Sequence, residues 1–587
     1  MPLLALLNRY LLDYRGLLLG VVVFQALQSF GLLLIPTLNA RMIDEGVARG
    51  DVPTVWAYGG WMVVVAVLQL GCNGIAIYCG AKCAMSAARD LRRDVFHHVV
   101  DMGHQDVSRF SAAGLITRNT NDIRQVQQFV VLSATMLVMA PLMSLGGIVM
   151  ALSESLRLSW IVVVTVVVLG VVMGLIVARM VPSFAVMQER IDALNSVTRQ
   201  QLTGIRVIRA FVREPAEAQR FAAANAAVTD ANLRVGRLFA LMFPTVMLII
   251  EAASVAVVWF GAVEVEAGTL GVGTMMAFIQ YLLMILMGVM IASFMAMMIP
   301  RAAVSAGRIL EVVDAEVTID FSGTDTRTPR PGDVELSGVE YRYPGAEQPV
   351  LTDVDVRVPA GTSLAVVGAT GSGKTTLAAL ISRLVDADVG TVRIGGTDVR
   401  DLAPSVLHAA IGLVPQQAYL FSGTIADTLR FAAPGASEEE MWAALDIAQA
   451  DFVRELPDGL EHELTQGGTN LSGGQRQRLA IARALVGRPP ILVFDDSFSA
   501  LDTATDKALR AALAREVDAT LVIIAQRIAT AQDADAILVL DGGRVVGYGT
   551  HAELAESNPV YREIVESQGA AVSAAPATGE EAGDVDG

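Results

Sequence analysis

Six apolar stretches, each long enough to cross a lipid bilayer as a helix, occupy the first half of the chain. A helix needs about 20 apolar residues to span the hydrocarbon core. The first stretch lacks a following small-residue cleavage site, so we expect it to be a retained span. The sequence therefore predicts a six-helix membrane domain over residues 1–310 and excludes a plain soluble protein. The stretches are residues 16–38, 53–81, 127–152, 158–181, 240–264 and 271–299.

The spacing of these stretches predicts which side of the membrane each connection faces. The connections after the second and fourth stretches run for about 45 and about 58 residues, and they have helical periodicity without further spans. Most of the arginines of this region lie in these two long connections, whereas the short ones hold Arg41, Arg49 and Arg157. Because basic residues favour the cytoplasmic side, the long connections and both termini are predicted to be cytoplasmic.

After Pro300 the pattern changes to that of an α/β domain. Residues 311–332 are predicted to be a linker, and 333–568 alternate short β-branched runs with helical stretches, which is typical of a largely parallel sheet. Residues 569–587, rich in alanine, glycine and acid, are predicted to be disordered. The net charge of −17, with acidic residues crowded into this half, argues against a nucleic-acid partner.

The run "GATGSGKT", residues 368–375, has the spacing of a phosphate-binding loop between a strand and a helix. Glycines let the backbone amides wrap the phosphates, the lysine reaches the β and γ phosphates, and the threonine hydroxyl can hold Mg²⁺. Asp495, at the end of the strand-like "ILVF", is placed to complete the metal shell. We therefore expect ATP and Mg²⁺ as ligands. The predicted contacts in this loop are Gly368, Ala369, Thr370, Gly371, Ser372, Gly373, Lys374, Thr375 and Thr376.

A second motif, "LSGGQRQRLAIARAL" at residues 471–485, has no role in a generic P-loop ATPase. Together with the phosphate loop it resembles the ATP-binding cassette family, over nearly the whole chain. "FSAAGLITRNTNDI" (110–123) and "LTGIRVIRAFVRE" (202–214) are similar to the two cytoplasmic loops of the family's exporters, whose coupling helices touch the nucleotide domains. The resemblance also implies a role for three single residues. They are Tyr343 stacking on adenine, Gln416 joining the metal site to the coupling helices, and Asp502 in the loop that crosses to the partner domain.

This resemblance implies that two cassettes pair head to tail, with each ATP between one chain's phosphate loop and the other's LSGGQ. Ser472, Gly473, Gly474 and Gln475 would then supply hydroxyl, amides and helix-end potential to the γ-phosphate of an ATP held by the opposite subunit. The same motif also suits a helix start, since serine is a favoured N-cap. Both interpretations can hold together.

Two positions depart from the family's hydrolytic pattern. The residue after the metal-binding aspartate is normally glutamate, but this chain has Asp496, whose carboxylate falls about 1.5 Å short. The family's histidine near the γ-phosphate is replaced by Gln526, which cannot carry a histidine's proton. Together they predict a catalytically degenerate site in a heterodimer whose other subunit keeps glutamate and histidine. A homodimer of weakly active cassettes is the alternative.

The transported compound is predicted less directly. Methionines in the sixth stretch could line a cavity for hydrophobic ligands or face lipid. Glu251, near the middle of the fifth stretch, could be a counter-charge for cationic amphiphiles or a protonated partner in an interhelical hydrogen bond. Cys72, Cys79 and Cys83 are expected to be packing residues. The methionines are Met275, Met276, Met284, Met287, Met290, Met295, Met297 and Met298.

The function expected from these features is one half of a heterodimeric exporter. It would move hydrophobic or amphipathic compounds, drugs or lipids, outward across a bacterial plasma (inner) membrane. Two alternatives are an importer of the same fold for a lipid or siderophore, and a subunit in which ATP binding gates a membrane partner without pumping.

Overall fold

The computed structural model describes residues 2–327, 329 and 332–573. It divides into two units by internal contacts. The membrane unit comprises residues up to 100 together with 112–315. The nucleotide unit comprises residues 101–111 together with those from 316 onward. Each unit is described separately, since each has its own apolar core.

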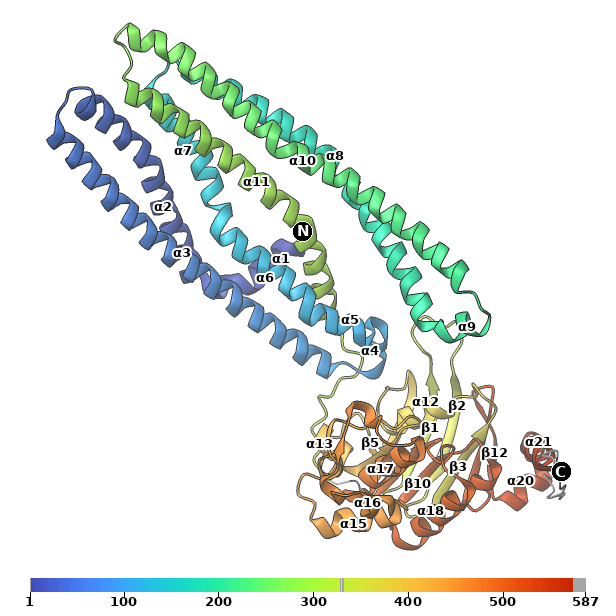
Figure 1. The fold of residues 1–587 in the computed structure, drawn as a ribbon. Coiled ribbons are helices and arrows are strands. Elements are labelled where there is room, and N and C mark those ends of the chain that lie inside the picture. Colours follow the sequence, from blue (N-terminus) through green and yellow to red (C-terminus); the bar gives the residue numbers. More distant parts are fainter. Residues whose placement is uncertain (1, 328, 330–331, 574–587) are drawn as a thin grey trace. The chain divides into compact units, whose positions relative to one another are not determined.

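The membrane unit is built from long helices (Figure 1). Among the described residues, six helical stretches are long and apolar enough to cross a bilayer. Each covers one of the six predicted apolar runs to within one residue, so the prediction of six spans is confirmed. Their lengths of 42 to 53 residues exceed the about 20 that a membrane requires, and the remainder extends beyond the hydrocarbon core. The stretches are Pro2–Val47, Val52–Asp101, Ala112–Glu154, Ser159–Thr203, Glu214–Glu266 and Val272–Val313.

Short 3₁₀ and π-helical segments, labelled η, divide some of these stretches into separate helical elements. The elements of the membrane unit are α1 (Pro2–Leu11), η1 (Leu12–Tyr14), α2 (Arg15–Arg41), η2 (Met42–Val47), α3 (Val52–Asp101), α5 (Ala112–Thr117), η3 (Arg118–Asp122), α6 (Ile123–Leu132), η4 (Ser133–Leu137), α7 (Met139–Glu154), α8 (Ser159–Thr203), α9 (Ile205–Ala210), α10 (Glu214–Glu266) and α11 (Val272–Val313).

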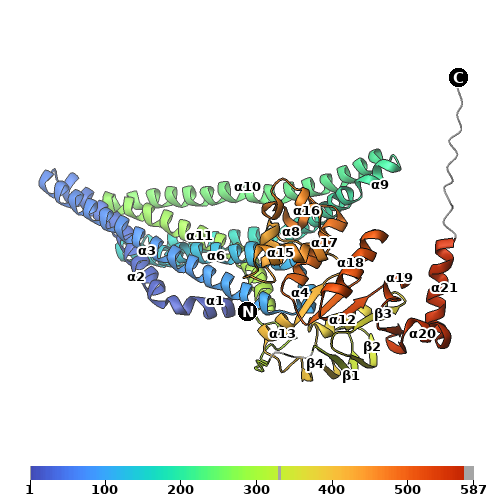
Figure 2. The ribbon, with the colours of Figure 1, turned by 90° about the horizontal axis from the view of Figure 1, so that it is seen from below.

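Within this unit α8 and α10 run side by side, joined by the short α9, whereas α11 packs against α2 and α7 (Figures 1 and 2). The buried Tyr281 hydroxyl of α11 lies 2.6 Å from Thr37 Oγ1 and 3.2 Å from the Leu33 carbonyl oxygen of α2. At the start of α11, Asp44 accepts hydrogen bonds from the backbone amides of Gly273 and Thr274, at 2.6 and 3.0 Å. These bonds satisfy the first amides of α11, which have no partner within the helix.

Many large apolar side chains of the membrane unit point outward, as a lipid-exposed surface requires. Trp56 is 79% exposed, Leu70 is 73% exposed and Trp259 is 72% exposed. The predicted cysteines lie on α3, where Cys72 and Cys83 are buried, Cys79 is half-buried, and all three are free thiols. This placement agrees with a packing role.

The nucleotide unit contains a six-stranded sheet of order β12-β11-β3-β10-β9-β6, parallel from β11 to β6 with β12 antiparallel. A four-stranded antiparallel sheet, β2-β1-β4-β5, lies beside it. The parallel register pairs Asp495 of β9 with Ile524 of β10, so these strands and β3 end at one edge of the sheet. Ligand sites of parallel sheets form at that edge.

The elements of the nucleotide unit follow in chain order. They are α4 (His104–Phe110), β1 (Val334–Tyr341), β2 (Leu351–Val358), β3 (Ser363–Gly368), α12 (Lys374–Ile381), β4 (Val389–Ile394), β5 (Thr397–Asp398), α13 (Pro404–Ala410), β6 (Ile411–Val414), β7 (Gly423–Thr424), α14 (Ile425–Arg430), α15 (Glu438–Ile447), α16 (Phe452–Glu455), η5 (Gly459–Glu461), β8 (Glu463–Leu464), η6 (Gln466–Gly468), α17 (Gly473–Val486), β9 (Ile491–Asp495), α18 (Thr503–Glu516), β10 (Thr520–Ile524), α19 (Ile528–Ala531), β11 (Ala536–Asp541), β12 (Arg544–Gly549), α20 (His551–Ser557) and α21 (Pro559–Ser573).

The predicted class, six membrane helices followed by an α/β nucleotide-binding domain, is confirmed. Two helices extend past the domain boundaries that the sequence suggests. Helix α11 continues to Val313, three residues into the expected linker, and α21 continues to Ser573, five residues into the expected tail. The rest of that tail, 574–587, and residues 328, 330 and 331 of the linker lie outside the described residues.

Candidate functional site

The phosphate loop connects β3 to α12 and leads directly into the first turn of that helix. Gly373 has a φ of 100°, and a Cβ there would lie 2.5 Å from a Leu351 methyl, so the position requires glycine. Lys374 Nζ donates to the carbonyl oxygens of Gly368 and Ala369 at 2.9 and 2.7 Å. Burial lowers the pKa of Lys374, although the nearby charges of Asp496 and Asp495 oppose that shift.

The loop has polar groups suited to a phosphate. Ser372 is 3% exposed, and its hydroxyl has no hydrogen-bond partner among the described residues. A buried hydroxyl without a partner is unfavourable, and a phosphate oxygen would satisfy it. The first amides of α12 provide further donors and positive potential. The hydroxyl and amide donors of the loop are therefore suited to bind a nucleotide phosphate.

Asp495 lies at the end of β9 beside this loop. Its Oδ1 accepts a hydrogen bond of 3.1 Å from Thr375 Oγ1. Burial raises the pKa of Asp495, and the adjacent Asp496 adds to that effect, while the Thr375 hydroxyl and Lys374 oppose it. An oxygen-rich group of Asp495, Thr375 and the Gln416 side chain suits a hard cation such as Mg²⁺.

Asp496 is held by two glutamine side chains. Gln416 Nε2 and Gln526 Nε2 both donate to Asp496 Oδ2, at 3.0 and 2.7 Å. The Asp496 backbone has a φ of 49°, which is uncommon for a residue other than glycine, and its amide donates to the Ile524 carbonyl oxygen at 3.1 Å. Hydrogen bonds to both the backbone amide and the side chain of Asp496 therefore fix the position of its carboxylate.

Most of the predicted ATP-binding residues meet in one pocket of about 390 Å³. Tyr343 lies at its edge, with its hydroxyl 3.1 Å from Thr376 Oγ1 and its ring packed edge-on against Tyr341. Val350 and Ile524 also line the pocket, and no sequence motif indicated them. The lining residues are Tyr343, Val350, Thr370, Gly371, Gly373, Lys374, Thr375, Thr376, Gln416, Asp495, Asp496, Ile524 and Gln526.

The LSGGQ residues and Asp502 do not line this pocket. Ser472 is the N-cap of α17, where its hydroxyl accepts from the Gln475 amide at 3.3 Å and the Gln475 side chain accepts from the Ser472 amide at 2.9 Å. Gly473, which follows, has open space around its Cα. Asp502 similarly caps α18 by accepting from the backbone amides at 504 and 505, at 3.1 and 3.0 Å. Their roles toward a partner's ATP stay predictions.

Gln568 is a further residue that the sequence did not indicate. From α21 it accepts a 2.8 Å hydrogen bond from the Ile528 amide and donates at 2.7 Å to the Gln526 carbonyl oxygen. It thereby fixes the backbone from which Gln526 reaches Asp496. Because it lies 42 residues from Gln526 in the chain and outside any motif, no local pattern could have found it.

The membrane unit has an apolar cavity of about 490 Å³ between η4, α8, α10 and α11. Met287 and Met290 of the predicted methionines line it, whereas Met295 is buried elsewhere in the unit, and the Met297 side chain lies outside the described part. Glu251 is exposed and does not line it. The lining residues are Met136, Met173, Val177, Met180, Phe239, Ala240, Met242, Phe243, Met287, Met290, Ile291, Ser293 and Phe294.

Membrane-spanning helices and a P-loop nucleotide site in one chain define a membrane protein powered by ATP. The family described as ABC transporter transmembrane region matches residues 18–290, and the family described as ABC transporter matches residues 351–499. The chain belongs to the ATP-binding cassette transporters. It is an ABC-type ATPase, with membrane and nucleotide-binding domains fused in one multi-pass chain.

The chain is similar to several curated proteins. An uncharacterised ABC transporter ATP-binding protein of Mycobacterium tuberculosis is 44% identical, over 96% of this chain and 98% of that protein. A multidrug efflux ATP-binding/permease protein of the same species is 34% identical over 95% of this chain but 47% of its own length. An ATP-dependent lipid A-core flippase of Pseudomonas fluorescens is 32% identical, over 85% of this chain and 84% of its own length.

A solved structure has the same fold. The structure of a bacterial Atm1-family ABC exporter with ATP bound matches 98% of this chain and 100% of its own, with a TM-score of 0.75 and 24% identity.

Proposed function

We propose that this chain is the degenerate-site subunit of a heterodimeric ABC exporter that moves hydrophobic or amphipathic compounds across a bacterial plasma membrane. Its own phosphate loop holds ATP with slow turnover, and its LSGGQ completes the active site of a partner that has glutamate and histidine. The observation that carries the proposal is the pair of hydrogen bonds from Gln416 and Gln526 to Asp496.

The chemistry of these residues supports slow hydrolysis. A general base must reach the proton of the attacking water, and Asp496 is shorter than the glutamate of active family members by about 1.5 Å. One of its oxygens already accepts from two amides. Gln526 donates a hydrogen bond but cannot exchange a proton as histidine does. A misplacement of this size can lower a rate by about a hundredfold.

Binding of ATP does not depend on that base. Lys374, the Ser372 hydroxyl and the amides at the start of α12 would bind the phosphates, and Tyr343 would contact adenine. Thr375, Asp495 and Gln416 would hold Mg²⁺, which supplies neutralisation of phosphate charge when bound. The site therefore keeps the groups that bind nucleotide while lacking a well-placed base.

The exposed LSGGQ supports pairing with a second chain. Ser472 and Gly473 are exposed on the nucleotide unit and belong to no ATP pocket of this chain. The multidrug efflux relative is about twice as long as the part that this chain matches, as expected if two such halves work together.

The apolar cavity of the membrane unit supports a hydrophobic transported compound. Most of its lining residues are methionines and phenylalanines, and Ser293 is the polar residue among them. Methionines adapt to varied ligand shapes. Multidrug and lipid relatives both agree with such a ligand. We further propose export, with both termini and the nucleotide unit in the cytoplasm. The importer of the same fold stays the alternative.

Purification of the tagged chain from its own host membrane tests this proposal. We expect a second, different ABC subunit to co-purify, the chain alone to hydrolyse ATP slowly, and the complex to hydrolyse it rapidly and to load hydrophobic dyes into inside-out vesicles. Rapid hydrolysis by the chain alone, or a complex of two identical copies, would overturn the pairing. Hydrolysis by the complex without transport would instead support the gating alternative.

A further inference from the structure

Two of the charged side chains that are buried in the nucleotide unit away from the ATP pocket contact the same segment of the chain. Asp106, in α4, is 7% exposed, and Arg383, just after α12, is 2% exposed. Buried charges are unfavourable unless they are paired or hydrogen-bonded. Both side chains bind the same short segment, residues 318–321, which leads from α11 toward the nucleotide-binding sheet.

Asp106 fastens α4 to one end of this segment. Its Oδ2 accepts from the Gly103 amide at 3.1 Å and from the amide and hydroxyl of Thr318 at 3.1 and 2.9 Å. A Cβ on Gly103 would lie 3.0 Å from a methyl of the buried Ile319. The beginning of α4 therefore packs closely on the linker, and one carboxylate oxygen holds both.

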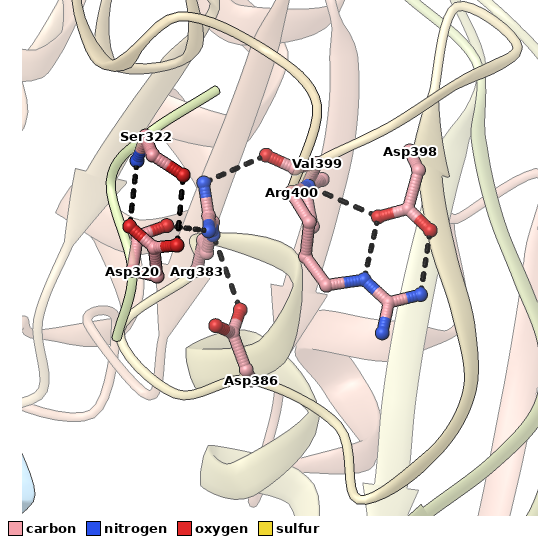
Figure 3. A network of polar contacts seen from close by, with 7 residues as sticks. All are labelled: Asp320, Ser322, Arg383, Asp386, Asp398, Val399 and Arg400. Atoms are coloured by element: carbon pink, nitrogen blue, oxygen red, sulfur yellow. Dashed lines mark hydrogen bonds and ion pairs between the residues drawn. The ribbon is translucent and has the colours of Figure 1, made fainter. Parts of the chain in front are cut away.

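Arg383 binds the other end of the segment, and its guanidinium has an acceptor for each nitrogen (Figure 3). Nη2 donates to the Asp320 carbonyl oxygen at 2.6 Å, Nη1 to the Val399 carbonyl oxygen at 3.0 Å, and Nε to Asp386 Oδ1 at 3.1 Å. The Phe321 ring centroid lies 5.3 Å from its Cζ. Arginine suits this site because its planar fork presents several donors at once.

The backbone of Arg383 ends the helix that begins at the phosphate loop. Arg383 has a φ of 49°, and its amide donates to the Leu380 carbonyl oxygen at 3.1 Å. Glycine commonly occupies such a left-handed position after a helix, so an arginine indicates that its side-chain contacts are needed there. Helix α12 has eight residues, or about 12 Å, and Lys374 and Thr375 form its other end.

We propose that Asp106 and Arg383 are positioning residues that couple α4 to the phosphate-binding end of α12 through residues 318–321. Helix α4 lies between α3 and α5 in the chain. A displacement of α4 therefore also displaces residues 318–321, because Asp106 is hydrogen-bonded to Thr318. Arg383 passes that displacement to α12, and thus to Lys374 and Thr375, which bind nucleotide. This coupling goes beyond the proposed function and does not depend on which partner the chain has.

A double-mutant cycle on the full-length chain in lipid nanodiscs tests the coupling. The variants are Asp106→Asn, Arg383→Lys and their combination, and the readout is the dissociation rate of a fluorescent ATP analogue. Asp106 and Arg383 share no direct contact, so effects of independent residues would multiply. We expect each single change to accelerate dissociation about fivefold and the combination to accelerate it little more. Either change alone already breaks the coupling between α4 and α12, so the second change has little further effect.

Arg400→Lys is the matched control for Arg383→Lys. Arg400 is a neighbouring arginine whose side chain pairs with Asp398 at 3.0 and 2.8 Å (Figure 3). Its effect should multiply with that of Asp106→Asn. Thermal unfolding of every variant, measured alongside, separates loss of stability from loss of coupling. If Arg383→Lys does not fold, Phe321→Leu replaces it, and Thr318→Val can likewise replace Asp106→Asn. Multiplicative effects in the first cycle, or singles with unchanged dissociation, would overturn the proposal.

Discussion

Gln526 Nε2 donates a 2.7 Å hydrogen bond to the same Asp496 oxygen that accepts from Gln416 Nε2 at 3.0 Å. The short acid and the two amides thus form one unit, with Oδ2 occupied by donors. In the family's active pattern the equivalent positions carry a longer acid and a histidine. The two departures are therefore in direct contact, which gives a physical reason to treat them together.

The first prediction concerns this pair. Asp496→Glu should raise ATP turnover at this chain's own site, and adding Gln526→His should raise it further, to about a hundredfold in the double variant, because the added methylene restores reach and the imidazole restores proton exchange. Single-turnover hydrolysis by the assembled transporter measures this. Asp541→Glu, which lengthens an exposed acid at the end of β11, is the control. No gain in Asp496→Glu would contradict the degenerate-site interpretation.

The second prediction separates the two possible roles of Ser472. Ser472 and Ser437 cap their helices with the same reciprocal hydrogen bonds, so replacing either by alanine should lower stability by about 1 kcal/mol. Only Ser472→Ala should also lower ATP hydrolysis of the assembled transporter, about tenfold or more, because it loses a γ-phosphate contact. ATPase rates and thermal unfolding of both variants test this. Equal ATPase rates in the two variants would leave Ser472 with a capping role alone.

The third prediction follows from the raised pKa of Asp495. The Asp495 carboxyl keeps its proton to a higher pH in the folded protein than in the unfolded chain. Protonation of Asp495 therefore contributes fully to the free energy of unfolding below pH 3.8, and this contribution is lost as pH rises through the folded pKa. Asp495→Asn should therefore raise the unfolding midpoint at pH 7 without nucleotide, by about 2 °C, with a smaller gain in acid.

The same Asp495→Asn variant should lose the stabilisation that Mg²⁺ and ATP give together, since a metal ligand is removed. Asp541→Asn, an exposed strand-end control, should change neither quantity. Thermal unfolding between pH 4 and 7.5 with a chelator measures the first effect, and titration with Mg-ATP measures the second. A lower midpoint for Asp495→Asn at pH 7 would contradict the argument from burial.

The fourth prediction concerns the methionine and phenylalanine cavity. Ala240→Trp places a large ring on its wall and should lower transport of a neutral hydrophobic dye about tenfold, because the ring takes volume that the ligand needs. Ala252→Trp, an exposed alanine on the same helix, is the matched control and should have little effect. Dye uptake by inside-out vesicles measures the transport rate of each variant. Equal uptake by the two variants would place the binding site elsewhere.

The fifth prediction concerns Glu251. Its side chain is exposed on α10 and does not line the cavity, so we expect Glu251→Gln to change transport of neutral and cationic dyes by the same factor. Parallel vesicle assays with a matched pair of dyes measure the ratio. A selective loss of the cationic dye would instead support Glu251 as a counter-charge.

The membrane helices and the phosphate loop could be predicted because the information for each is local. A bilayer requires about 20 consecutive apolar residues, and a phosphate loop requires glycines at fixed spacings within eight residues. Both requirements are visible in the chain as printed. Neither depends on what the rest of the molecule does, which is why the six spans and the loop from Gly368 to Thr375 lie where they were expected.

The contacts that connect these parts depend on packing between distant residues. Asp106 and Thr318 are 212 residues apart and Gln526 and Asp496 are 30 apart, and each pair meets because strand register and helix packing set its distance. The same holds for Gln568 on α21 and for the outward direction of Glu251. Side-chain direction follows from the packed backbone, so a pattern along the chain could name these residue types but not their partners.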